Sequence, residues 1–333
     1  DRLYFFVQDL VTKSRSITIG NIDPLRSVYY SAQRFMQKMA MHALNIGRIL
    51  VIAAFLSSSL SAQVLQTETE SWRIARENTL LADNGWLTVA GLFFLTEGTN
   101  HFGSSPANDI VLRYGPEHAG TFTLKNNDIT VHALDGETLI VDGEKVETAK
   151  LWPHPATPAP TISIGPLSLF AHYSGSRLAI RLRDQASATR TDFEGLRWFP
   201  VDPSYRVKGR YIPRETPVEL KLPNILGDVE LFRSSGMVEL TIDEHELRMS
   251  AIDAGDKLWF IFRDMTSGKE TYSAARFLYA DSPEDGITFV DFNRAYNPPC
   301  AFNPFTTCPL PPLENRLPVR IEAGEMDYHA GQK

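Results

Sequence analysis

The sequence predicts a mainly all-β protein, in which two small β-sandwich or barrel-like domains follow one N-terminal amphipathic helix. Short apolar runs separated by turn residues occupy most of the chain beyond residue 85, without intervening helical patterns. Asp-Gly pairs between several runs are strong hairpin signals. A chain of 333 residues with 43% hydrophobic residues is long enough for two domains, each with its own core.

The first 62 residues are not expected to belong to the fold. Residues 41–62, MHALNIGRILVIAAFLSSSLSA, place Arg48 before a short apolar run and small residues, which is the layout of a secretory signal peptide. Residues 1–40 lack an initial Met, and we interpret them as an overextended start. The alternative is a genuine N-terminal segment followed by a buried helix or membrane anchor. The signal peptide predicts a periplasmic or secreted protein with no stable membrane span after cleavage.

The first predicted domain comprises residues 66–151. Residues 67–82 repeat apolar side chains near helical period and begin with acidic residues, which the helix dipole favours, so an amphipathic helix is expected there. After Asn84-Gly85 the pattern changes to short apolar runs, and Asp142-Gly143 marks a hairpin. A β meander should therefore follow the helix.

A proline-rich linker is predicted at residues 152–161, because its four prolines disfavour regular strand pairing. The second β domain then covers residues 162–330, with turns at residues 264–269 and 282–286. It ends in a loop, residues 291–316, with the sequence DFNRAYNPPCAFNPFTTCPLPPLENR. This loop contains six prolines and both cysteines of the chain.

Composition argues against several functions. The net charge is −7 and the Lys and Arg residues are scattered, so nucleic acid is not an expected partner. The common hydrolase, metalloprotease, phosphate-loop and dinucleotide motifs are absent from the sequence. Residues 243–246, DEHE, are most simply a solvated turn. Seven residues separate Cys300 from Cys308, which is outside the usual zinc-ligand spacing, and no metal or cofactor is predicted.

The two cysteines are disulfide candidates. In an oxidising compartment a bond between Cys300 and Cys308 would stabilise the fold by about 2 to 3 kcal/mol, as chain entropy predicts for a short loop. Two buried thiols that pack as small apolar groups are the alternative. A catalytic thiol is a third interpretation, with Arg294 or Arg316 as the cationic partner.

The polar residues of the C-terminal loop and of the strand before it form the candidate ligand site. Prolines would hold them in a fixed arrangement at a sheet edge, and a preorganised loop loses little entropy on binding. The opposing interpretation is a structural polar network that satisfies backbone groups. The candidate ligand-binding residues are Arg276, Asp291, Asn293, Arg294, Tyr296, Asn297, Asn315 and Arg316.

Two resemblances accompany these patterns. The blocks FEGLRWFPVDPSYRV and TYSAARFLYADSPEDGITFVDFNRAYNPPC, within a likeness that covers roughly residues 70–328, resemble the bacterial family of domains of unknown function DUF1684. This resemblance supports the C-terminal block and supplies no reaction. Residues 98–122 more weakly resemble forkhead-associated domains, which read phosphothreonine through an Arg and a Ser-x-x-His. Ser104 stands where that Arg belongs and only His118 is kept, so a small β fold reused as a scaffold is the simpler interpretation.

Two function classes remain open. The first is an exported, non-catalytic module that binds a small polar or anionic ligand, or a glycan, at residues 291–316. The second is an exported hydrolase, in which Asp291 or Glu314 acts as general base and Arg276, Arg294 and Arg316 hold the substrate. Phosphopeptide binding by the N-terminal β domain is a remote third alternative.

Overall fold

The computed structural model describes residues 31, 34–36, 38–39, 41–42, 61–134, 136–152 and 158–328. The predicted start and signal peptide lie mostly outside the described residues, as do residues 153–157 of the predicted linker. The chain divides into two compact units, Asp1–Val64 and Leu65–Lys333, and the second contains every described strand. Within the described part of the chain, no helix is both long enough and apolar enough to cross a membrane.

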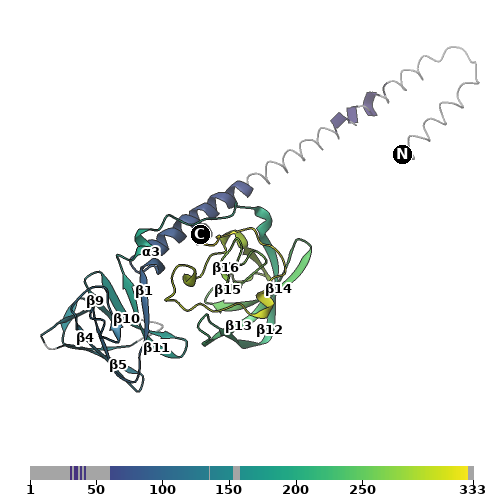
Figure 1. The fold of residues 1–333 in the computed structure, drawn as a ribbon. Helices are drawn as coiled ribbons and strands as arrows, with labels where there is room; N and C mark the ends of the chain where they lie inside the picture. The colour runs from purple at the N-terminus through teal and green to yellow at the C-terminus, as the bar shows by residue number, and fades with distance from the viewer. Residues whose placement is uncertain are drawn as a thin grey trace, which may run out of the picture. The chain divides into compact units, whose positions relative to one another are not determined.

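The first β region of the second unit is a sandwich of two sheets (Figure 1). The six-stranded sheet has the order β1-β11-β10-β9-β6-β7, and the five-stranded sheet has the order β3-β2-β4-β5-β8. Buried side chains from both sheets form one core, in which Phe102 and Phe122 face Leu169 and Ile180. The strands are β1 (Val89–Phe94), β2 (Gly98–Gly103), β3 (Ile110–Val111), β4 (Gly120–Lys125), β5 (Asp128–Ala133), β6 (Leu139–Val141), β7 (Glu144–Val146), β8 (Thr148–Leu151), β9 (Thr161–Ile164), β10 (Leu167–Ser174) and β11 (Arg177–Asp184).

Local sequence explains the hairpins of the sandwich. In β10 the residues alternate between buried and partly exposed positions, as expected for a strand with one face on a core. Asn126 and Asn127 join β4 to β5 with φ angles of 52° and 67°. Asp142 and Gly143 join β6 to β7 in the same left-handed region, so this predicted hairpin is confirmed.

The predicted domain boundary at residues 152–161 is wrong. Strand β9 pairs with β6, and β11 pairs with both β10 and β1, so residues 161–184 complete the first sandwich. The boundary predicted between domains 66–151 and 162–330 therefore falls inside a single sandwich. Prolines disfavour strand pairing, but a run of prolines does not by itself distinguish a connection within one domain from a linker between two domains.

The second β region is a single six-stranded sheet that curls into a nearly closed barrel, with the order β16-β15-β14-β13-β12-β17. Its main core includes Met249, Phe260, Phe262 and Leu278. The predicted turns at residues 264–269 and 282–286 lie between strands, and Asp243 and Glu244 of the DEHE segment form an exposed turn. The strands are β12 (Arg206–Pro223), β13 (Val229–Ile242), β14 (His245–Ala254), β15 (Lys257–Phe262), β16 (Arg276–Asp281) and β17 (Ile287–Asp291).

The predicted N-terminal helix is described over residues 61–81. Its buried Leu80 packs with Leu87 and with Ala301 and Phe302 of the C-terminal loop. This small core joins the helix, the start of the sandwich and the barrel loop. The short helices are η2 (Trp86–Thr88), α3 (Ala188–Thr191), η3 (Pro203–Tyr205), η4 (Phe292–Arg294), η5 (Pro299–Ala301) and η6 (Leu313–Asn315).

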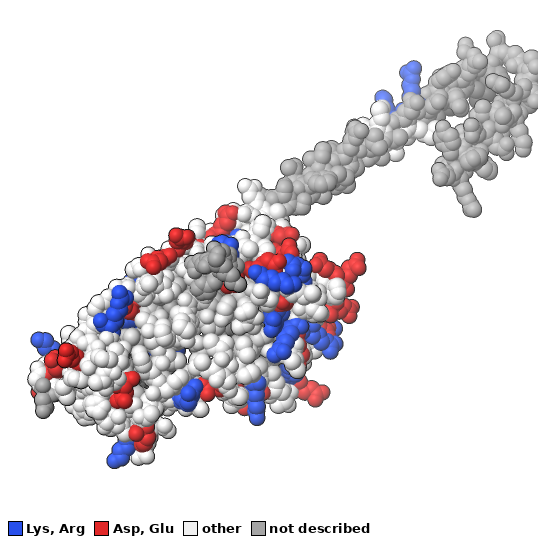
Figure 2. Space-filling view, in the orientation of Figure 1, with Lys and Arg blue, Asp and Glu red and all other residues white. Residues whose placement is uncertain are grey.

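Charged side chains of both signs are interspersed on the face of the molecule that Figure 2 shows. Among the described residues, oppositely charged side chains pair across neighbouring strands, such as Lys257 with Asp281 at 2.9 Å and Arg233 with Asp253 at 3.2 Å. Exposed pairs of this kind contribute little to stability, about 0 to 1 kcal/mol each.

Candidate functional site

Three of the predicted site residues hold the C-terminal segment onto the barrel. Arg276 is fully buried and donates hydrogen bonds to the carbonyl oxygens of Ile321 and Ala323 and to the carboxylate of Asp264. Burial lowers the pKa of Arg276, and Asp264 opposes that shift. Its terminal nitrogens serve the C-terminal backbone and Asp264, as the structural interpretation requires, while its buried Nε has no partner among the described residues.

The side chains of Asn293 and Asn315 also form hydrogen bonds with the protein's own backbone. Asn293 exchanges two 2.9 Å hydrogen bonds with the backbone of Asp202, and its Nδ2 also donates to Asp291. Asn315 accepts from the backbone N–H of Ser250 at 2.7 Å and donates to the carbonyls of Ser250 and Ile261. We call Arg276, Asn293 and Asn315 the C-terminal clasp.

The other predicted residues do not meet in one cleft. The carboxylate of Asp291 caps η4 by accepting from the N–H of Asn293. Arg294 lies 3.4 Å from Glu68 of the helix and 3.6 Å from Asp291. Glu314 and Arg316 are exposed. Asn297 donates from Nδ2 to the carbonyl of Met326 at 2.8 Å. Among the candidate ligand-binding residues, Tyr296 alone lines the cleft described next, together with the disulfide candidate Cys308.

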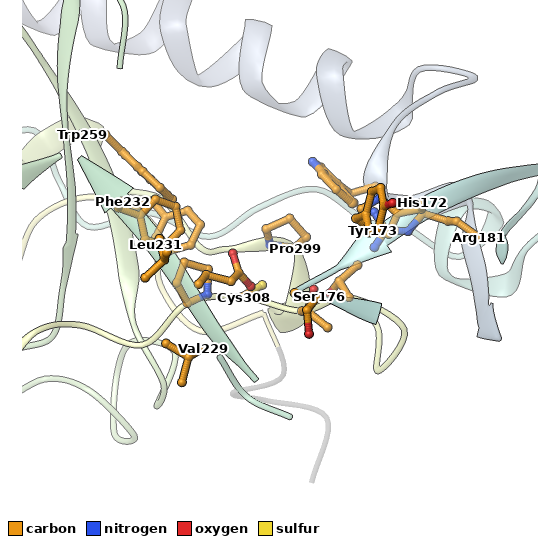
Figure 3. A pocket seen from close by; sticks show the side chains of 17 residues that line it. His172, Tyr173, Ser176, Arg181, Val229, Leu231, Phe232, Trp259, Pro299 and Cys308 are labelled. Atoms are coloured by element: carbon orange, nitrogen blue, oxygen red, sulfur yellow. The ribbon is translucent and has the colours of Figure 1, made fainter. Parts of the chain in front are cut away.

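The cleft lies between the sandwich and the barrel within the second unit. It comprises two neighbouring pockets, of about 600 and 450 Å³, which have Trp86, Trp259, Phe277 and Pro299 in common and which we call its two lobes. In the larger lobe, the β10–β11 hairpin contributes one wall and β13, β15 and β16 contribute the other. Figure 3 shows His172, Tyr173, Ser176 and Arg181 on one side, Val229, Leu231, Phe232 and Trp259 on the other, and Pro299 and Cys308 between them.

Arg181 is the unusual group of the larger lobe. Every second residue of β11 points away from the sandwich core, because Leu178, Ile180 and Leu182 fill the core positions. Arg181 is only 5% exposed, yet within the described residues it has no hydrogen bond and no carboxylate partner. Its guanidinium lies 5.5 Å from the centre of the Trp86 ring. Burial, and then the neighbouring Arg183, lower the pKa of Arg181 to about 10, so the group is still charged at neutral pH.

His172 stands beside Arg181 on the same face of the sheet. Its strand β10 pairs with β11 so that His172 is opposite Ala179, two residues from Arg181. Burial and the charge of Arg181 lower the pKa of His172 to about 4. The imidazole is therefore neutral at pH 7 and adds a donor and an acceptor to the lobe without adding charge.

The smaller lobe is lined mainly by aromatic rings. Trp259 of β15, Phe277 and Tyr279 of β16 and the following Tyr296 share one face of the barrel sheet, since Trp259 is opposite Tyr279 and Phe277 is opposite Tyr296. The planes of Trp259 and Tyr279 differ by 19°, and those of Tyr279 and Tyr296 by 16°. Trp72 from the helix closes the far side.

Arg76 of the helix also lines the smaller lobe, but its charge is compensated. Its guanidinium lies 4.7 Å from the centre of the Tyr296 ring, donates to the carbonyl of Asn297 at 2.9 Å and faces the buried carboxylate of Glu325 at 3.6 Å. Burial raises the pKa of Glu325 to about 7, and Arg76 opposes the shift. Arg76 therefore fixes the helix to the barrel, whereas Arg181 has no such partner.

Cys300 and Cys308 are neighbouring thiols in the structure. The backbone N–H of Cys300 lies 3.2 Å from Sγ of Cys308, and Cys308 lines the larger lobe. Burial raises the pKa of Cys308, and a hydrogen bond with Cys308 lowers that of Cys300. A disulfide between them stays a prediction.

The polar groups of the segment that resembles forkhead-associated domains form hydrogen bonds within that segment. Ser104 donates to the carbonyl of Gly115 at 3.0 Å, and its N–H donates to the carbonyl of Pro116. His118 hydrogen-bonds Asn108, whose side chain bridges two backbone carbonyls. These polar groups hold two loops together.

The comparisons with known proteins concern mainly the barrel. A family model described as "Protein of unknown function (DUF1684)" matches residues 191–326. The solution NMR structure of an uncharacterized protein from Haloarcula marismortui is 32% identical, over 41% of this chain and 78% of that chain, with a TM-score of 0.36. No curated protein matches the sequence significantly.

Proposed function

The chain belongs to the DUF1684 family of proteins of unknown function, and we propose that it binds a small organic anion in the cleft without transforming it. The observation that carries this proposal is Arg181. A buried charge without a partner costs several kcal/mol, and a bound carboxylate would supply the missing opposite charge. Charge-assisted hydrogen bonds from a guanidinium to a carboxylate are among the stronger polar contacts in proteins.

Binding is favoured over catalysis by the groups that line the cleft. The carboxylate of Glu230 accepts a hydrogen bond from Asn224, and the raised pKa of Cys308 leaves little thiolate to act as a nucleophile. Neither of the predicted general bases, Asp291 and Glu314, lines the cleft. The hydrolase alternative therefore gains no support from the geometry. We further propose that binding takes place outside the cytoplasm, because residues 41–62 have the layout of a signal peptide.

Phosphopeptide binding by the sandwich remains the remote alternative that the sequence raised. A phosphate reader needs charge-assisted donors at its binding loops. Ser104 is uncharged and already hydrogen-bonded, and Arg113 lies 3.7 Å from Asp184. The cleft, which offers a buried cation without a partner, is the better-supported site.

Calorimetric titration with small carboxylates and with their neutral amides tests the proposal. The full chain should bind hexanoate and not hexanamide at pH 7. Arg181→Met should weaken hexanoate binding by about 10- to 100-fold, the equivalent of one lost charge-assisted hydrogen bond of about 1.5 to 3 kcal/mol. The same variant should unfold at an equal or higher temperature than the wild type, because it removes an unpaired buried charge.

Arg183→Met is the matched control. Arg183 lies two residues further along the same face of β11, is also partly desolvated and does not line the cleft. This variant should retain carboxylate binding. Equal affinity of the wild type and Arg181→Met for hexanoate, or equal affinity of the wild type for acid and amide, would overturn the proposal.

A further inference from the structure

We infer that the ligand is an aromatic carboxylate whose ring lies in the smaller lobe, against Trp259, Tyr279 and Tyr296, while its carboxylate pairs with Arg181. This inference rests on the proposed function and specifies the chemistry of the ligand. It uses residues of the smaller lobe that the anion proposal leaves without a role.

The arrangement of the rings supports a flat ligand. Trp259, Tyr279 and Tyr296 stand on neighbouring backbone segments of one sheet face, with ring planes within 19° and 16° of their neighbours. Aromatic groups interact best in offset-stacked or edge-to-face arrangements, and nearly parallel rings offer a further flat ring several of these at once. Tyr279 is 46% exposed, so its ring is open to a ligand.

Trp86 lies between the proposed sites for the carboxylate and for the ring of the ligand. Trp86 lines both lobes, and the guanidinium of Arg181 lies over its ring. A molecule held at Arg181 by its carboxylate would therefore extend along Trp86 toward the aromatic lobe. Pro299, Trp259 and Phe277 also line both lobes, which makes the path apolar.

The charges in the cleft determine which aromatic compound fits. Aromatic pockets often bind organic cations through the faces of their rings. Here Arg76 already covers one face of Tyr296 and Arg181 lies over Trp86, so a cationic ligand would find one ring face occupied and would be repelled by the uncompensated charge of Arg181. An uncharged ring with a carboxylate on a short chain meets a favourable partner at each end.

Trp259 offers the ligand its ring and not its indole N–H. Its indole Nε1 is buried, and no described residue accepts a hydrogen bond from it. Buried indole N–H groups normally find an acceptor. Because this nitrogen is shielded from the cleft, the ligand is expected to contact the face of the Trp259 ring and not its N–H.

Isothermal titration of the full chain with three acids of similar size tests the inference. The probes are 3-phenylpropionate, 3-cyclohexylpropionate and glucuronate. The phenyl acid should bind about tenfold more tightly than the cyclohexyl acid, because stacking on more than one ring adds to the shared apolar contact. Tyr279→Leu should remove most of this preference.

Phe289→Leu is the control for Tyr279→Leu, because Phe289 is also 46% exposed but lies on β17 outside the cleft. It should keep the full preference for the phenyl acid. Equal binding of the phenyl and cyclohexyl acids, or tighter binding of glucuronate, would overturn the aromatic inference. If Arg181→Met still weakens all three acids in that case, the anion site stands. If none of the three acids binds, both proposals fail.

Discussion

Replacing Glu325 by glutamine should remove a pH dependence from the stability of the protein. The side chain of Glu325 is fully buried, and its backbone N–H donates to the carbonyl of Ala295. Gly324 permits this close approach, since its φ is 82° and an added Cβ would lie 2.5 Å from the Ala295 oxygen. Arg76 lowers the pKa of the Glu325 carboxyl. The carboxylate in turn raises the pKa values of Arg276 and Tyr296.

The sign and size of the effect follow from the raised pKa of Glu325. Burial moves this pKa from 4.5 to about 7, so at intermediate pH the folded state binds a proton that the unfolded state has released. Stability is therefore fullest below pH 4.5 and falls as the pH rises through 7. At about 1.4 kcal/mol for each pKa unit, the total loss is about 3 kcal/mol.

Urea denaturation of the wild type and Glu325→Gln at several pH values from 5 to 8 measures this loss. The stability of the wild type relative to Glu325→Gln should fall by about 2 to 3 kcal/mol over that range. Glu314→Gln, the same substitution at an exposed position, is the surface control. If the difference for Glu325→Gln is constant, then Arg76 stabilises the carboxylate enough to cancel the effect of burial, and the reasoning is refuted. Arg76→Met should shift the midpoint to higher pH, because it removes the nearest cation.

Three further predictions concern the fold. Asn315→Ala should lower the free energy of unfolding by about 3 kcal/mol, since it leaves buried groups of Ser250 and Ile261 unpaired, whereas Glu314→Ala should change it by less than about 0.5 kcal/mol in the same denaturation assay. A chain without residues 1–62 should still unfold cooperatively by calorimetry, because the second compact unit begins at Leu65; loss of the transition would contradict the division into units. Protein produced in an oxidising compartment should show no free thiol when denatured without reductant, and reduction should lower its stability by about 2 to 3 kcal/mol; two titratable thiols would contradict the disulfide.

The strands and turns could be predicted because their signals are local. Asp142 and Gly143 take the left-handed φ angles that a short hairpin needs, and the alternation of β10 matches its burial. The domain boundary could not be predicted, because it depends on which strand pairs with which. Strand β11 lies beside β1, almost 90 residues earlier in the chain, and no local feature of either strand specifies that pairing.

The site shows the same division between local and long-range information. The sequence drew attention to residues 291–316 through their prolines and polar groups, but Asn293 and Asn315 use those groups on the protein's own backbone. Arg181 was not singled out from the sequence, because residues 178–184, LAIRLRD, have the pattern of a common half-buried strand. A signal was present, because Arg177, Arg181 and Arg183 lie on one face of β11. Only the fold shows that Arg181 is buried there without a partner.

The proline-rich segment therefore contributes to the proposed site indirectly. Its clasp residues fix the segment on the barrel, and Tyr296, Pro299 and Thr306 then form parts of the cleft walls. Walls that are rigid before binding lose little entropy when a ligand arrives. Stability and binding should consequently depend on different residues. Substitutions of the clasp residues should lower the stability of the fold, and should weaken binding only because less protein is folded. Arg181→Met should weaken binding by about 10- to 100-fold and leave stability equal or higher. The opposite pattern would mean that Arg181 supports the fold and that the clasp contacts the ligand.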